Sequence, residues 1–360
     1  MPTSILPAAL REIDARRICL IKPSALGDVA QTLPLLAPLR RRFPDAEISW
    51  VVNRELSGLL EGHPELHEVI PFDRHGSPRS AWRLLRRLRE GRFDLTIDLQ
   101  GLLRSGFMTW ATGARARIGL ETAREGAQLA YHGMIPDSGR DIPAYARYWR
   151  LAEALGQGSV PRQAIVSYGP SDRNWVRDRL WGLPRPFVAV HPGARWETKR
   201  WPADSFAEVA ARVCEQFSGS IVVIGGHGDW KLGSQITEVV TARRGRVINL
   251  AGHTSLKGLA ALLQQVDLLV SNDSGPLHLG AELGTPVVGV YTCTSPRISG
   301  PSGSHQALIG TEEACAASYH RRCPRRAAGH LACLQEVTPD RVWRGVLKLL
   351  QERPVIVRSA

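Results

Sequence analysis

Two short polar segments, far apart in the chain, contain the residues best suited to acid–base and anion-binding chemistry. They are Lys22–Asp28 (KPSALGD) and Asn272–His278 (NDSGPLH). Each follows an apolar run that indicates a strand and precedes a helix-like pattern. Ligands bind open α/β sheets at such strand ends. The two segments therefore predict two α/β domains that face each other across a cleft.

Asp28 follows Gly27 at the start of the first expected helix. Free backbone N–H groups and the helix dipole favour an ionised carboxylate at that position. Such a carboxylate can act as a general base and accept a proton from a substrate hydroxyl. Aspartate is also a frequent N-terminal helix cap. The spacing supports the two interpretations equally.

Asp273, Ser274 and Gly275 lie at the strand-to-helix turn of the second half, with His278 on the first helical turn. Backbone N–H groups at such a turn bind a diphosphate. Gly275 permits a close approach of the backbone, and His278 can hydrogen-bond a phosphate oxygen. The alternative is a capped helix with a surface histidine.

Two more loops follow strands of the second half. The loop His191–Pro202 contains Lys199, which can neutralise charge on a leaving diphosphate. Gly225 and Gly226 leave room for a flat nucleoside, and Asp229 can bond ribose hydroxyls. The alternatives are an ordinary surface connection with a solvated lysine and a glycine-rich turn without a ligand.

Alternation of short β-branched runs with amphipathic stretches predicts the elements that position these residues, and indicates a parallel sheet in each half. Strands are expected at residues 17–21, 48–52, 95–99, 187–191, 220–224, 247–250, 268–270 and 287–291. Helices are expected at residues 29–42, 82–89, 102–111, 205–216, 231–242, 255–264, 276–283 and 340–351.

The predicted domains are a first Rossmann-like domain over residues 1–160 and a second Rossmann-like domain over 161–338. Residues 339–360 form a C-terminal helix and tail that is expected to pack near the domain junction. Residues 156–170 are rich in Gly, Pro, Ser and Gln, which is typical of a linker. A length of 360 residues suits two domains of this size.

The chain has 46 Lys and Arg against 34 Asp and Glu, a formal net charge of +12. This excess attracts a polyanion such as nucleic acid, anionic lipid or a phosphorylated sugar, or it is simply a solvated surface. The first 17 residues lack the apolar core of a secretion signal, and no apolar run approaches the roughly 20 residues that span a bilayer. A cytoplasmic location is therefore expected.

Six cysteines are too few and too unevenly spaced for a disulfide framework, so most are expected to be reduced thiols. Cys315, Cys323 and Cys333, with His320 and His330 between them, offer types of side chain that bind zinc. The paired C-x-x-C spacing of structural sites is missing. No metal site is therefore predicted.

Five segments in order resemble the bacterial lipopolysaccharide heptosyltransferases, glycosyltransferase family 9. The resemblance covers nearly the whole chain, and its segments are residues 22–34, 93–105, 121–125, 191–202 and 271–278. The segment ETARE at 121–125 favours a heptosyltransferase I-like N-terminal half. The cysteine-containing segment near the C-terminus departs from that pattern and leaves the acceptor and the donor sugar open.

The resemblance implies a GT-B fold of two Rossmann-like domains and an inverting transfer of heptose from ADP-heptose to the Kdo and inner-core region of lipopolysaccharide. It further implies a lipid-linked anionic glycan as acceptor, peripheral contact with the cytoplasmic face of the inner membrane, and no cofactor for the transfer. Asp28 matches the family's proposed base. The donor set is Thr198, Lys199, Gly225, Gly226, Asp229, Asp273, Ser274, Gly275 and His278. The acceptor set is Ser24, Gln100, Arg104 and Arg124.

Residues 79–92 form a basic amphipathic segment, with arginines around Trp82, Leu84, Leu85 and Leu88. A helix of this kind can lie on an anionic membrane surface. A helix packed on the sheet with a basic exterior is the favoured interpretation.

Two other functions compete with heptose transfer. One is a GT-B enzyme that uses another nucleotide sugar or an acceptor outside lipopolysaccharide. The other is a basic nucleic-acid-binding protein without catalysis, which would cluster exposed aromatics with Lys and Arg on one face. That protein would have no use for Asp28 and Asp273, so no nucleic-acid partner is predicted.

Overall fold

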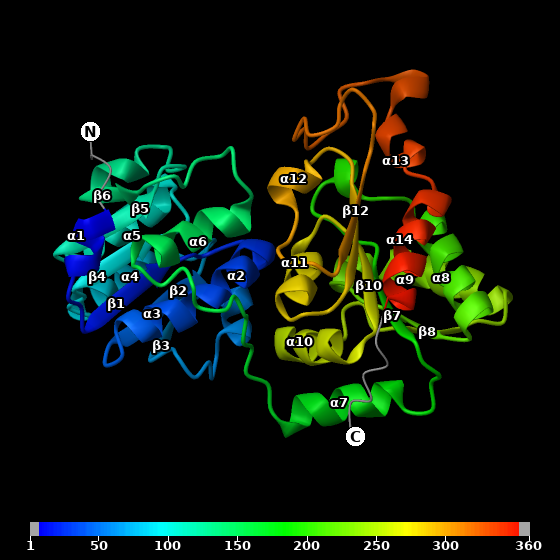
Figure 1. The fold of residues 1–360 in the computed structure, drawn as a ribbon, viewed down its shortest axis with the longest axis horizontal. Coiled ribbons are helices and arrows are strands. Elements are labelled where there is room, and N and C mark those ends of the chain that lie inside the picture. Colours follow the sequence, from blue (N-terminus) through cyan, green and yellow to red (C-terminus); the bar gives the residue numbers. More distant parts are fainter. Residues whose placement is uncertain (1–6, 353–360) are drawn as a thin grey trace. The chain divides into compact units, whose positions relative to one another are not determined.

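A computed structural model describes residues 7–352, and the chain divides into two compact units between Ser167 and Tyr168. Each unit contains one six-stranded parallel sheet flanked by helices (Figure 1). The predicted α/β class with two doubly wound domains is confirmed. The predicted linker, residues 156–170, contains the point of division. The cleft between the domains stays a prediction.

The sheet of the first unit has the strand order β3-β2-β1-β4-β5-β6. The chain winds outward from β1 in one direction and from β4 in the other, so the switch point that binds ligands in such sheets lies between β1 and β4. The strands are β1 (Arg17–Ile21), β2 (Glu47–Asn53), β3 (Glu68–Phe72), β4 (Leu95–Asp98), β5 (Ala116–Leu120) and β6 (Gly133–Ile135).

Strands β3, β5 and β6 were not predicted. Strand β3 lies at the sheet edge and contains Glu68 and Pro71, which weaken its apolar alternation. Strand β5 contains Arg117, and β6 has only three residues. Strand propensity alone does not identify strands that are this short or this polar.

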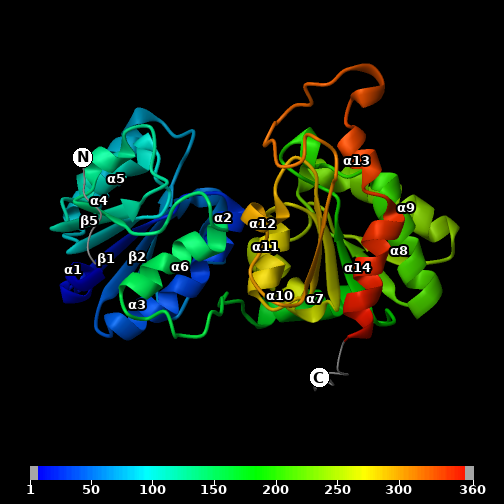
Figure 2. The same ribbon diagram turned by 45° about the horizontal axis from the view of Figure 1, so that its top comes forward.

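Helices cover both faces of this sheet. Helix α4 packs on α5, whereas α2 packs on α6 (Figure 2). The helices and 3-10 turns are α1 (Pro7–Glu12), α2 (Leu26–Thr32), η1 (Leu33–Leu35), α3 (Leu36–Arg42), η2 (Arg54–Leu59), α4 (Pro78–Glu90), α5 (Leu103–Thr112), η3 (Ala127–Ala130) and α6 (Ala144–Ala154). The single helix expected at 29–42 is interrupted at Pro34, because proline cannot donate the hydrogen bond that a continuous helix needs there.

Helix α4 buries Leu84 and Leu88 in a core cluster that also contains Ile21, Ile70 and Met108. Its arginines lie on the outer side, and Arg86 stacks on the exposed ring of Trp82. The favoured interpretation of this segment, a packed helix with a basic exterior, is therefore correct.

The sheet of the second unit has the order β12-β11-β10-β7-β8-β9, which places its switch point between β7 and β10. Its strands are β7 (Phe187–His191), β8 (Ser220–Val223), β9 (Arg246–Asn249), β10 (Leu268–Asn272), β11 (Val287–Tyr291) and β12 (Gln306–Gly310). Only the edge strand β12 was not predicted.

The second unit has helices on both faces as well, with α8 packed on α9 and α14, and α10 packed on α7 and α11. Its helices and turns are α7 (Pro170–Leu180), η4 (Glu197–Lys199), α8 (Ala203–Phe217), η5 (His227–Asp229), α9 (Trp230–Ala242), α10 (Leu256–Gln265), α11 (Gly275–Glu282), α12 (Pro296–Ser299), η6 (Ala327–Gly329), α13 (Ala332–Glu336) and α14 (Pro339–Gln351).

Helix α14 supplies the apolar stripe that the sequence indicates. Val342, Trp343 and Val346 are buried with α8 and the sheet in the core of the second unit. Its placement near the domain junction stays a prediction, as does the tail beyond Glu352, which lies outside the described residues.

No helix within residues 7–352 is both long enough and apolar enough to cross a bilayer. All six cysteines are free thiols, as expected from their spacing.

Candidate functional site

Asp28 lies in the first turn of α2, just beyond the carboxyl end of β1. Its Oδ2 accepts the backbone N–H of Ala25 at 3.1 Å, so the carboxylate does cap the helix. Its Oδ1 accepts a 2.7 Å hydrogen bond from the hydroxyl of Tyr148 on α6. The side chain is still 39% exposed, so a substrate hydroxyl can reach it. Capping and acid–base chemistry are therefore compatible at this residue.

A buried cation lies beneath this carboxylate. Nζ of Lys22 is 3.8 Å from Oδ1 of Asp28, and the lysine side chain is only 3% exposed. The same ammonium lies 4.9 Å from the centre of the Tyr148 ring. Burial lowers the pKa of Lys22, whereas Asp28 and Asp98 act in the opposite direction. The positive charge favours the ionised form of Asp28, which a general base needs.

The loop after β4 lies beside the loop after β1, across the switch point. Oε1 of Gln100 accepts the N–H of Ser24 at 3.3 Å, which brings two predicted acceptor residues together. The buried carboxylate of Asp98 fixes this loop by accepting the N–H groups of Gln100 at 2.8 Å and Gly101 at 3.0 Å. Burial raises the pKa of Asp98, although the Tyr131 hydroxyl also donates to it.

The other two predicted acceptor residues lie on neighbouring segments of the same unit. Arg104 begins α5 and stacks 5.4 Å from the centre of the Phe72 ring, at the end of β3. Arg124 follows β5, and its backbone N–H donates to the carbonyl of Gly101 at 2.9 Å. Ser24, Gln100 and Arg124 thus lie on loops at the carboxyl ends of β1, β4 and β5, and Arg104 lies in the first turn of α5, which follows β4.

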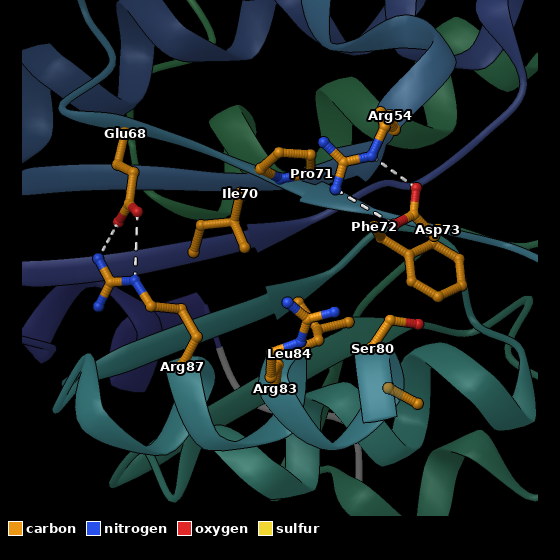
Figure 3. Close-up of a pocket in the computed structure, with 11 residues that line it drawn as sticks. Arg54, Glu68, Ile70, Pro71, Phe72, Asp73, Ser80, Arg83, Leu84 and Arg87 are labelled. Carbon is orange, nitrogen blue, oxygen red and sulfur yellow. Dashed lines mark hydrogen bonds and ion pairs between the residues drawn. The ribbon is translucent and has the colours of Figure 1, made fainter. Parts of the chain in front are cut away.

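A pocket of about 330 Å³ lies between edge strand β3 and helix α4 (Figure 3). Two ion pairs flank it: Arg54 Nε to Asp73 Oδ1 at 2.6 Å, and Arg87 Nη2 to Glu68 Oε2 at 2.5 Å. Arg83 projects between these pairs, so the lining carries one more positive than negative charge. Phe72 lines the pocket and also contacts Arg104, which places a cationic hollow next to the predicted acceptor residues.

In the second unit, Asp273 is the centre of a buried polar network at the end of β10. Its Oδ2 accepts from Nζ of Lys199 at 2.6 Å and from Oγ1 of Thr294 at 2.7 Å. Its Oδ1 lies 3.3 Å from Nε2 of His278. Burial would raise the pKa of Asp273, but His278 and Lys199 lower it to about 2. Asp273 therefore holds the Lys199 ammonium at the N-terminus of α11.

Ser274 precedes α11 and hydrogen-bonds Nδ1 of His191 at 3.0 Å, so the ends of β7 and β10 are joined at the switch point. Gly275 and Pro276 form the first helical positions, where no acidic side chain occupies the first turn. Burial lowers the pKa of His191 to about 4, and the imidazole is neutral at pH 7. The local charge at this helix end is consequently set by Lys199 and Asp273.

The loop with Lys199 is fixed by a segment near the C-terminus. Thr198 Oγ1 donates to the carbonyl of His320 at 2.7 Å, and the guanidinium of Arg321 stacks 5.3 Å from the Trp196 ring. Nζ of Lys199 also lies 4.8 Å from the centre of the Trp196 ring. The cysteine-containing segment, which the sequence left without a role, therefore buttresses the predicted donor loop.

Gly225, Gly226 and Asp229 lie together at the end of β8. Oδ2 of Asp229 accepts the N–H of Gly226 at 2.9 Å. A Cβ atom at Gly193 or Gly225 would lie less than 3.0 Å from side-chain atoms of Asp229, so glycine at both positions leaves room for the Asp229 carboxylate. The nine predicted donor residues are accordingly grouped on the segments that follow three neighbouring strands of one unit, β7, β8 and β10, with Gly275 and His278 in helix α11.

The sequence did not identify Tyr148, Asp98 or Thr294. Tyr148 is 120 residues from its partner, and no motif connects the two. Asp98 belongs to the segment FDLTIDLQG and could have been noted as a charged residue in an apolar strand. Within residues 7–352, no group of three or more His, Cys, Asp or Glu side chains is arranged to hold a metal ion.

The chain is similar to known glycosyltransferases along most of its length. Residues 81–328 match the model of glycosyltransferase family 9 (heptosyltransferase). Lipopolysaccharide heptosyltransferase 2 of Escherichia coli is 30% identical over 93% of this chain and 98% of its own. Lipopolysaccharide heptosyltransferase 1 of Pseudomonas aeruginosa is 28% identical over 85% of this chain and 87% of its own.

A solved structure shows the same fold. The structure of E. coli ADP-heptose lps heptosyltransferase II superimposes with a TM-score of 0.74 at 24% identity, over 93% of this chain and 99% of that one. The predicted GT-B fold is confirmed by this match. The two switch-point sites, the match to more than half of the chain and the shared fold agree: the protein belongs to glycosyltransferase family 9, the lipopolysaccharide heptosyltransferases.

Proposed function

We propose that this glycosyltransferase moves heptose from ADP-heptose to the Kdo and inner-core region of lipopolysaccharide, with inversion at the anomeric carbon and Asp28 as general base. Two relatives that cover most of the chain are named lipopolysaccharide heptosyltransferases, and the name of the solved relative includes ADP-heptose. These names support the donor and the acceptor class.

The observation that carries the proposal is the setting of Asp28 at the end of β1. Its carboxylate has Tyr148 and Lys22 on one side and is accessible on another. In the proposed step, the acceptor hydroxyl gives its proton to this carboxylate. The hydroxyl oxygen forms a bond to the anomeric carbon while the bond from that carbon to the diphosphate oxygen breaks. ADP leaves with the electron pair.

The leaving diphosphate needs positive charge on the opposite side of the reaction. Backbone N–H groups at the start of α11 bind anions through the helix dipole. Lys199, held 2.6 Å from Asp273, adds a side-chain ammonium. The proposed contacts with the diphosphate and the sugar are completed by Thr198, Ser274, Gly275 and His278. The proposed contacts with the nucleoside are made by Gly225, Gly226 and Asp229. These groups offset the developing charge without a cofactor.

The proposed acceptor side uses Ser24, Gln100, Arg104 and Arg124. Arginine forks pair well with the carboxylates of Kdo-type sugars. The cationic pocket beside Phe72 extends this side and supports an anionic acceptor. Because such an acceptor is lipid-linked, we further propose that the protein works at the cytoplasmic face of the inner membrane.

The test is to supply purified protein with a panel of nucleotide sugars and truncated core acceptors. We expect ADP release only with ADP-heptose and a Kdo-containing acceptor. The product linkage should then show the opposite anomeric configuration to that of the donor. Equal or faster transfer from another nucleotide sugar, or to a glycan without Kdo, would favour the alternative GT-B activity.

A further inference from the structure

Helix α5 has an apolar stripe on its outer side. Leu103, Phe107 and Trp110 are 51%, 57% and 65% exposed, and their spacing of four and three residues places them on one helix face. The opposite side of the helix is buried and includes Met108. Large apolar side chains arranged this way on a soluble domain mark an interaction surface.

A fourth exposed apolar side chain lies on the turn that packs against this helix. Turn η3 packs on α5 where Gly106 meets Ala127, and a Cβ atom at Gly106 would lie 2.8 Å from the Ala127 Cα. Leu129 on that turn is 84% exposed. We call Leu103, Phe107, Trp110 and Leu129 the α5 apolar face.

Arginines outnumber acidic residues on the elements beside the α5 apolar face. Helix α4, which packs on α5, carries five arginines and one glutamate. The Arg89 guanidinium lies against the backbone of Gly113 at the end of α5. Arg104 and Arg115 are exposed on or near the same helix. The acidic groups here are Glu125, whose Oε2 accepts the Leu103 N–H at 3.4 Å, and Asp94, which pairs with Arg115 at 3.6 Å. An apolar face with an arginine-rich helix beside it is complementary to an anionic bilayer surface.

The position of this surface also suits a lipid-bound substrate. Helix α5 begins three residues after Gln100, at the carboxyl end of β4. Leu103 is therefore adjacent in the chain to Arg104 and close to the loop that Asp98 fixes. A bilayer beneath α5 would present its headgroups next to the acceptor-side residues, without a membrane-spanning helix.

We propose that the α5 apolar face is the membrane-docking surface of this protein and inserts into the interfacial region of anionic lipid bilayers. Phe107, Trp110 and Leu129 enter the interface, where tryptophan is favoured, and the arginines of α4 and α5 contact lipid phosphates. The binding itself is independent of the proposed reaction. Its use in presenting the acceptor rests on the proposed function.

The experiment measures co-sedimentation of the full chain with vesicles of phosphatidylcholine and phosphatidylglycerol, and with vesicles of phosphatidylcholine alone. Wild type should bind the anionic vesicles, and salt should weaken this binding. The double variant Phe107→Ser, Trp110→Ser should bind at least about tenfold less, since it removes two apolar side chains from the interface. Leu129→Ser should give a smaller loss in the same direction.

Trp181→Ser is the matched control, because Trp181 is 82% exposed in the second unit. It should bind vesicles like wild type. Thermal unfolding of all variants checks that the fold is kept. Wild type that ignores anionic vesicles, or a double variant that binds them normally, would overturn the proposal. A dimer that the double variant converts to monomer would overturn it too, since the face would then contact a second copy.

Activity separates this inference from the proposed function. The double variant should lose transfer to an acceptor presented in vesicles and keep transfer to a deacylated, water-soluble acceptor. If wild type binds vesicles through this face but transfers heptose to neither acceptor, the proposed function fails and the docking surface stands.

Discussion

The hydroxyl of Tyr148 donates a 2.7 Å hydrogen bond to Oδ1 of Asp28, although the two residues belong to helices α6 and α2. Burial raises the pKa of Tyr148 well above its usual range, and the charge of Asp28 adds to the effect. The phenol therefore stays protonated and always acts as donor. One carboxylate oxygen is held by α6 and the other by the N–H of Ala25, which fixes the orientation of the proposed base.

Tyr148→Phe should reduce kcat several-fold and move the acidic limb of the pH–rate profile to higher pH. A hydrogen bond to an ionised carboxylate favours that form, so its loss makes protonation easier. Steady-state rates across pH measure both effects. Tyr145→Phe on the same helix, whose ring packs 5.1 Å from Arg162, is the control and should leave the profile in place. An unchanged profile for Tyr148→Phe would show that the hydroxyl does not act on the base.

Lys199→Ala should lower kcat/KM by about 10- to 100-fold and weaken ADP binding, because an ammonium at the start of α11 is lost and Asp273 is left buried without it. Calorimetric titration with ADP and initial rates measure the two effects. Lys231→Ala, an exposed lysine on α9, is the control. Normal ADP binding and turnover in Lys199→Ala would remove Lys199 from the donor site.

The stability of the second unit should fall as pH drops below about 6.5, in part through His191. Its folded pKa of about 4 lies below the unfolded value, so the unfolded state takes up the proton first. The contribution of His191 to the free energy of unfolding is fully present above the pKa of the unfolded state. It is lost as the pH falls toward the pKa of the folded state, at about 1.4 kcal/mol per pH unit and roughly 3 kcal/mol in all. Urea unfolding at a series of pH values should therefore show the difference between wild type and His191→Gln shrinking over this range. A constant difference would contradict the shift.

Trp201→Ala should destabilise the second unit by about 3 to 5 kcal/mol. Trp201 is 2% exposed, packs edge-on against Phe206 at 4.8 Å and donates from Nε1 to the carbonyl of Val337 at 2.7 Å. Trp201→Phe keeps most of the packing and should lose less. Denaturant unfolding measures both, and equal losses would mean that the indole hydrogen bond, rather than volume, decides stability.

The sequence predicts the elements that follow simple periodicity. Central strands such as Phe187–His191 are continuous apolar runs because both faces of the sheet are covered, and such runs are easy to recognise. Edge strands such as Glu68–Phe72 carry charge and proline because one side is open, so they look like loops. The break at Pro34 was missed because the apolar pattern continues through it.

The candidate site was predictable where its residues are contiguous. The segments around Asp28 and Asp273 each combine a strand end with a helix start, which local sequence encodes. The contacts of Tyr148 with Asp28 and of Thr294 with Asp273 depend on the tertiary fold, and local sequence does not contain them. The hydrogen bond between Thr198 and the carbonyl of His320, 122 residues apart, likewise depends on the tertiary fold.

The most direct test of the account is the transfer rate of Asp28→Asn with ADP-heptose and a Kdo-containing acceptor, measured together with its affinity for the donor. The amide keeps the size of the side chain but cannot take the proton. The account predicts a rate lower by about 10² to 10⁴-fold with donor affinity unchanged, while Asp178→Asn on the surface behaves like wild type. Turnover by Asp28→Asn within a few-fold of wild type would contradict the role of Asp28 as the base.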